Sequence, residues 1–261
     1  MKILNADRYI NEKLNIKPVT RTRLAGMRVH KYKYYPQSKF ELKSIIDDRI
    51  AAEGDLCDLN DIDVSAIDDM SHLFYESTFN GNISQWNVHN VTTMECMFSR
   101  SSFKGDISKW NVCKVKNMTD MFKLSLFDND ISDWNVSNVK YMSGMFHTSQ
   151  FNGDLSKWDV SKVFDMTGMF CYAEKFNGDL SKWNVSRSQT MTYMFYGARK
   201  FNSDISKWDV SNVITMTQMF EKASSFDQDL SGWNTKSIMV YTDMFKDCPL
   251  ENQPEKQPIF K

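Results

Sequence analysis

Carboxylate and amide side chains recur at two fixed places around the seven tryptophans of this 261-residue sequence. One Asp or Asn directly follows each Trp, and another stands four residues before it: Asn82, Asp106, Asp130, Asp154, Asp179, Asp204 and Asp229. Stacked carboxylates could bind Ca²⁺, but the same side chains form turns by accepting hydrogen bonds from nearby backbone N–H groups. The sequence lacks the Gly-rich spacing of calcium-binding repeats. We therefore favour turns and expect no metal site.

The other reactive side chains follow no pattern. The four His residues share no repeat position and have no Ser or Cys at a fixed distance, so a catalytic triad is not indicated. Five Cys without metal-type spacing fit a reducing compartment. Phosphate-loop and dinucleotide-binding motifs are missing from the sequence. The sequence thus predicts neither an enzyme nor a cofactor.

Residues 1–43 form a basic arm. They hold 11 Lys and Arg against 3 Asp and Glu, a net charge of +8, whereas residues 44–261 hold 21 against 30, a net charge of −9. This arm could contact nucleic acid, dock on the acidic remainder of the chain or anchor the protein to a larger assembly. For the remainder, the negative charge argues against polyanion binding. The candidate contact residues of the arm are Arg21, Arg23, Arg28, Lys31 and Lys33.

The tryptophans that organise these side chains mark a repeat. Each Trp follows a Phe by seven residues and precedes a Met-Phe pair by eleven. A fixed period of this size is typical of a repeat array. A degenerate unit with Ile62 in place of Trp precedes the first full one, as expected of a terminal cap. Three intervals of 24 residues and then three of 25 separate Trp86, Trp110, Trp134, Trp158, Trp183, Trp208 and Trp233.

Apolar residues after Trp fall at the second, fifth, eighth and eleventh positions, with Ser188 and Thr235 as the polar exceptions. A step of three fits neither an amphipathic helix nor a strand, but it fits the inner wall of a coil that turns repeatedly. No Pro occurs between Pro36 and Pro249, so a backbone ladder between coils is not blocked there. We expect a repeat solenoid of about eight stacked coils over residues 56–246, with short parallel β-strands.

Units such as residues 151–170, FNGDLSKWDVSKVFDMTGMF, resemble the repeats of BspA-like leucine-rich-repeat proteins, which also form a domain of unknown function in mycoplasma surface lipoproteins. The resemblance implies a leucine-rich-repeat-like solenoid, a binding or adhesion role and no catalytic residues. Residues 44–55 resemble the helix that caps such arrays, and residues 247–261 follow as a C-terminal tail.

The sequence predicts a different location for this chain from that of the family members found at bacterial surfaces. Residues 1–8 show no apolar signal region and no lipid-acceptor Cys, and no apolar run approaches the length of a membrane span. We therefore expect a cytoplasmic or virion-associated protein. Since the family is also widespread in phages, one alternative is a phage-encoded virion or assembly component docked through residues 1–43. Another is a nucleic-acid-associated protein that uses the arm.

The residues that vary between units are the candidates for recognition. Positions six, seven and ten after Trp flank inward Val and Met residues, so they are expected to point outward. Four of them, Tyr141, Phe164, Tyr193 and Ile214, would form an apolar patch across the middle units. Such a patch is a candidate protein interface, although scattered surface residues or packing against the arm would give the same pattern. The preferred function is a non-enzymatic protein-interaction solenoid that presents a binding face, with the basic N-terminal arm as an anchor.

Overall fold

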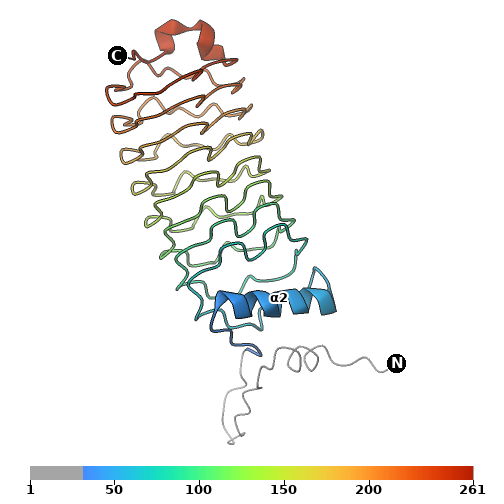
Figure 1. The fold of residues 1–261 in the computed structure, drawn as a ribbon. Helices are drawn as coiled ribbons and strands as arrows, with labels where there is room; N and C mark the ends of the chain where they lie inside the picture. The colour runs from blue at the N-terminus through green and yellow to red at the C-terminus, as the bar shows by residue number, and fades with distance from the viewer. Residues whose placement is uncertain (1–31, 261) are drawn as a thin grey trace, which may run out of the picture.

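The computed structural model describes residues 32–260, which wind into turns stacked along one axis to form a rod (Figure 1). Helix α2, Lys39–Glu53, lies across one end. The 3₁₀ helices η1, Pro249–Asn252, and η2, Pro254–Lys256, close the other. None of the helices within this described part has the length and apolarity needed to cross a bilayer.

Parallel backbone pairing joins each turn to the next at one recurring position, seven residues after Trp. It runs from Asp69 through Thr93, Asn117, Tyr141, Asp165, Thr190 and Thr215 to Val240. The turns therefore stack in register at the repeat spacing. Within residues 32–260 these pairs are isolated bridges, whereas the sequence predicts short strands. The chain cannot stay extended, because a left-handed residue such as Asp120, with φ of 53°, or Gly144, with φ of 60°, follows three residues after each bridge residue at this position.

The core consists of side-chain columns that run through the rod. In the first full unit, Val88, Val91, Met94 and Met97 are at most 1% exposed, which confirms that the step of three faces inward. Phe rings of successive units stack on one another, as the near-parallel rings of Phe98 and Phe122 do at 5.7 Å between centroids. Each turn thus buries its apolar residues against its neighbours rather than within itself.

Every tryptophan ties its turn to the preceding one by the same hydrogen bond. The indole Nε1–H donates to the carbonyl oxygen of the Ile or Leu that stands three residues before the previous Trp, or of Leu59 in the degenerate unit. For Trp158 the acceptor is Ile131, at 3.1 Å. This hydrogen bond accounts for a Trp in every full unit, because a Phe ring could fill part of this space but could not donate.

Helix α2 covers the first turn. It begins at Lys39, five residues before the expected start, because the Ser38 side chain caps it by accepting a hydrogen bond from the Glu41 N–H at 3.2 Å. Leu42, Ile45 and Ile46 face the core and are at most 1% exposed. The boundary between arm and cap therefore lies before residue 39 rather than at residue 43.

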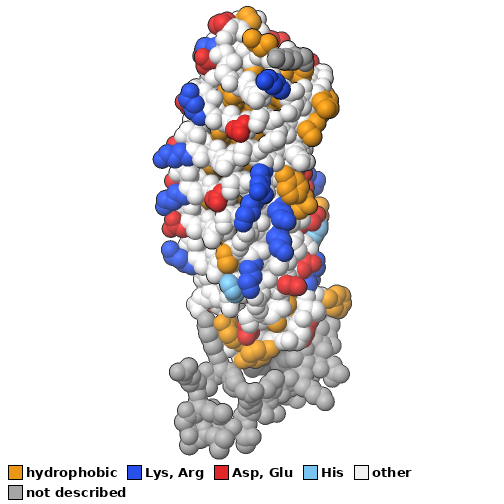
Figure 2. Space-filling view, turned by 90° about the vertical axis from the view of Figure 1, so that its left-hand side faces the viewer, with side chains coloured by type: hydrophobic (Ala, Val, Ile, Leu, Met, Phe, Trp, Pro, Cys, Tyr) orange, Lys and Arg blue, Asp and Glu red, His pale blue; other side chains and the backbone are white. Residues whose placement is uncertain are grey.

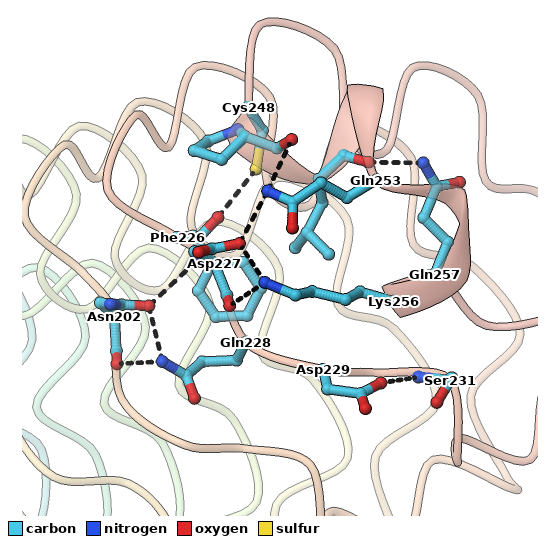
Figure 3. Close-up of polar contacts among 12 residues, drawn as sticks. Asn202, Phe226, Asp227, Gln228, Asp229, Ser231, Cys248, Gln253, Lys256 and Gln257 are labelled. Carbon is cyan, nitrogen blue, oxygen red and sulfur yellow. Dashed lines mark hydrogen bonds and ion pairs between the residues drawn. The ribbon is translucent and has the colours of Figure 1, made fainter.

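The C-terminal segment is a second cap rather than a free tail. Leu250 is fully buried, and the Leu230 N–H donates to the Lys256 carbonyl at 2.8 Å. Around them, Asp227 accepts hydrogen bonds from Lys256 at 2.7 Å and from Gln253 at 2.8 Å (Figure 3). In the earlier turns the following turn supplies hydrogen-bond partners, whereas the C-terminal segment supplies them for the last turn.

Candidate binding groove on the repeat array

The local backbone places two columns of outward side chains side by side. Positions four and six after each Trp flank a buried residue at position five, which is Val115, Val139 or Val163 in three successive units. Because the turns stack in register, side chains at these positions line up along one face of the rod. Whatever residues the repeats carry here are therefore brought together from different units.

Two adjoining hollows of about 940 and 400 Å³ lie over these columns. Both are lined by Lys140 and Lys162, so they form one continuous depression, which we name the basic groove. Figure 2 shows Lys and Arg side chains gathered midway along one face of the rod. No Asp or Glu lines the groove within the described residues. Its cationic side chains are Lys114, Lys116, Lys140, Lys162, Arg187 and Lys236.

These cations have no carboxylate partner in residues 32–260, since none of them takes part in a salt bridge there. Two are held by neutral amides of the preceding unit: Lys114 donates to Asn90 Oδ1 at 2.9 Å, and Lys162 to Asn138 Oδ1 at 2.7 Å. Elsewhere on the rod exposed lysines pair with carboxylates, as Lys157 does with Asp133 at 2.9 Å. The groove therefore carries uncompensated positive charge.

Apolar side chains line the half of the groove nearer the C-terminal cap, and this half also holds Arg187 and Lys236. Phe164 is half-buried, while Ile214 and Met239 are 43% and 78% exposed. The ring of Tyr141 meets that of Phe164 edge to face, with 4.6 Å between centroids. The groove thus offers an exposed apolar surface beside its cations.

The structure divides the apolar patch predicted from the sequence. Phe164 lies against Tyr141, and it lines the groove together with Ile214. Tyr193 does not line the groove, because its ring packs against Tyr196 at 5.9 Å. A second tyrosine, Tyr172, lies 5.0 Å from the same ring of Tyr196. The predicted residues therefore belong to two separate surface clusters.

Of the basic arm, Arg21, Arg23, Arg28 and Lys31 lie outside the described residues. Lys33 is described, and its Nζ lies 3.3 Å from a carboxylate oxygen of Asp61 in the first turn. Its backbone N–H also donates to the Asp61 carbonyl at 2.7 Å. At this residue the arm docks on the array.

Sequence reasoning missed the basic groove because it averaged charge over the whole array. The net charge of −9 argued against polyanion binding by residues 44–261, yet cations gather in one groove whose lining contains no Asp or Glu among the described residues. The signal was available: Lys stands at position four or six after Trp in three consecutive units, as Lys114 and Lys116, Lys140, and Lys162. Only the stacking of the turns makes these residues neighbours.

The Asp and Asn residues four before Trp form turns, as favoured from the sequence. Each accepts the backbone N–H of the Ser two residues later, at 2.8 Å between Ser156 and Asp154. Within the described residues no three His, Cys, Asp or Glu side chains are placed to hold a metal ion. Burial raises the pKa of Cys171 and of Cys248 to about 11, so these two thiols stay protonated at neutral pH.

Comparison with known proteins gives one match. The model of a family described as Mycoplasma protein of unknown function, DUF285, matches residues 42–155 and again residues 142–257. The two matches together cover the repeat array and helix α2 from residue 42 onward. No curated protein and no solved structure matches the chain.

Proposed function

We propose a protein-binding role for this chain, which belongs to the DUF285 family of Mycoplasma proteins of unknown function. In this proposal the repeat array is a non-enzymatic module that presents the basic groove to a partner protein. The array is a leucine-rich-repeat-like solenoid of the BspA type. The 24- and 25-residue turns and their parallel bridges support that fold, and the repeat motif supports the BspA-like relationship.

The observation that carries the role is the composition of the basic groove. Cations without carboxylate partners in residues 32–260 lie beside exposed Ile214 and Met239, in a groove lined by residues of seven stacked turns. An exposed apolar patch rimmed by polar and charged side chains is typical of a protein interaction site. Stacked repeats also supply the extended surface that a partner of ordinary interface size, about 800 Å² per side, needs.

The test is site-specific photo-crosslinking followed by reconstitution. A photoreactive amino acid replaces Gln189, which lines the groove and is exposed, and in a control replaces Lys182, which is exposed and does not line it. We expect one protein from the source cells to crosslink at position 189 but not at position 182. That protein is then identified and purified.

Binding of the purified partner is measured against two surface variants. Phe164→Asp places a charge in the apolar end of the groove, and we expect about tenfold weaker binding. Tyr193→Asp makes the same kind of change in the other surface cluster and should leave binding within twofold. Equal crosslinking at positions 182 and 189, or equal losses in the two variants, would refute the proposed binding face.

A further inference from the structure

We propose that the occupant of the basic groove is an extended, acidic segment of the partner protein, with an apolar side chain at one end. Its carboxylates pair with Lys114, Lys116, Lys140, Lys162 and Arg187, and its apolar side chain contacts Phe164 and Ile214. This inference rests on the proposed protein-binding function and adds the chemistry of the ligand.

Charge is the first argument. Six exposed cations share one groove that contains no Asp or Glu among the described residues; five of them come from four successive turns, and Lys236 lies two turns further along. Like charges held close together repel one another, and no carboxylate among the described groove residues offsets this repulsion. The remainder of the array is acidic, with carboxylates that pair with other lysines. Carboxylates of a partner would supply the missing charge and steer it to this face.

The dimensions of the groove set the length of the segment. Lys114 and Arg187 belong to turns three steps apart. At about 4.8 Å per step, these turns are separated by roughly 14 Å, and an extended chain at about 3.3 Å per residue covers that distance with four to five residues. Two further turns bring the segment to Met239, at about seven residues. A short linear segment is therefore sufficient.

The apolar end distinguishes a peptide from a nucleic acid. Single-stranded nucleic acids are held by successive flat aromatic faces on which bases stack. Among the described residues that line the groove, Phe164 is the aromatic one, and it is half-buried, while Ile214 and Met239 are aliphatic. Aliphatic surface beside a single ring fits a Leu or Phe side chain better than a run of bases. Both the cations and the apolar side chains of the groove therefore fit an acidic peptide better than a nucleic acid.

The experiment measures fluorescence anisotropy of a labelled peptide in which four Glu are followed by Leu-Phe-Leu. We expect saturable binding by the full chain that weakens several-fold as salt rises from about 50 to 300 mM. Replacing Glu by Gln in the peptide should abolish it. A charge-reversed double variant, Lys116→Glu with Lys140→Glu, should weaken binding at least about tenfold.

The matched control is Lys182→Glu with Lys207→Glu. It changes the net charge equally at two exposed lysines that do not line the groove, and it should alter binding less than twofold. Equal weakening by both double variants would show attraction to net charge alone and would overturn the inference. All four substitutions are at exposed positions, and an unchanged urea midpoint verifies that each variant is folded.

Two further results separate this inference from the proposed function. If the peptide does not bind but the crosslinked partner does, and Phe164→Asp weakens the partner, the protein-binding role stands and the acidic-segment inference fails. If labelled oligothymidylate of equal charge binds more tightly than the peptide and the Lys116 and Lys140 reversal abolishes it, the occupant is a nucleic acid and the inference is again overturned.

Discussion

Replacing Trp158 by Phe tests whether the interturn hydrogen bond, rather than ring size alone, explains the repeated tryptophan. Trp158 is 3% exposed, and its indole N–H donates to the Ile131 carbonyl at 3.1 Å. Phe retains a stacked aromatic ring but has no donor. The substitution therefore leaves a buried carbonyl oxygen of the previous turn without its partner.

The magnitude follows from two contributions. An orphaned buried acceptor costs about 1–3 kcal/mol. The smaller ring leaves a cavity in a column in which the next ring, Phe146, lies 6.3 Å away, and a loss of this size costs roughly 1 kcal/mol more. We therefore expect Trp158→Phe to lower the free energy of unfolding by about 2–4 kcal/mol.

The assay is urea unfolding followed by far-UV circular dichroism, with the change read from the midpoint and slope of the transition. The control is Lys182→Ala, an exposed change in the neighbouring turn, for which we expect less than about 0.5 kcal/mol. If Trp158→Phe costs no more than this control, the hydrogen bond contributes nothing and our account of the Trp period is wrong.

Three further outcomes can be measured by the same unfolding assay. Hydrogen bonds from the Ser156 backbone N–H and side chain lower the pKa of Asp154. The folded-state pKa therefore lies below the unfolded value of about 3.9. The ionised carboxylate thus stabilises the fold fully above about pH 5, and this stabilisation is lost as the pH falls through the folded-state pKa. Asp154→Asn keeps the turn, as Asn82 does in the first unit, and should show a smaller loss between pH 5 and pH 3; an unchanged pH profile would contradict this. Gly168→Ala should cost about 1 kcal/mol through backbone strain alone, because φ is +58° and the added Cβ would meet only Cys171, at 3.7 Å; a neutral result would count against strain at this position. Truncation after residue 248 should lower the urea midpoint and promote self-association seen by light scattering, because it uncovers the last turn; a monomeric, equally stable product would show that the second cap is dispensable.

Most of the core could be predicted from sequence. The buried positions of each turn follow from one rule, because a side chain that recurs every 24 or 25 residues must meet its own copies when turns stack. Val88 and Met94 are buried as that rule requires. The exact start of helix α2 was missed, since the capping role of Ser38 depends on a local backbone geometry that periodicity does not describe.

The candidate site was only partly predictable. Outward exposure of Tyr141 and Ile214 follows from their places beside inward residues. The separation of Tyr193 from Phe164 does not, because positions six and ten after Trp are divided by the path of the chain around the turn. Whether two outward residues meet depends on that path, which the apolar pattern leaves open.

The sequence by itself determined the period, the core columns and the turn chemistry of this protein, because each of these is a local pattern copied from unit to unit. Only the tertiary structure decided which surface is distinctive. Lys116 and Lys140 are 24 residues apart in the chain and line the same groove because their turns stack in register. Charge density is a property of positions in space, so the basic groove exists only after stacking, on an array whose total charge is negative.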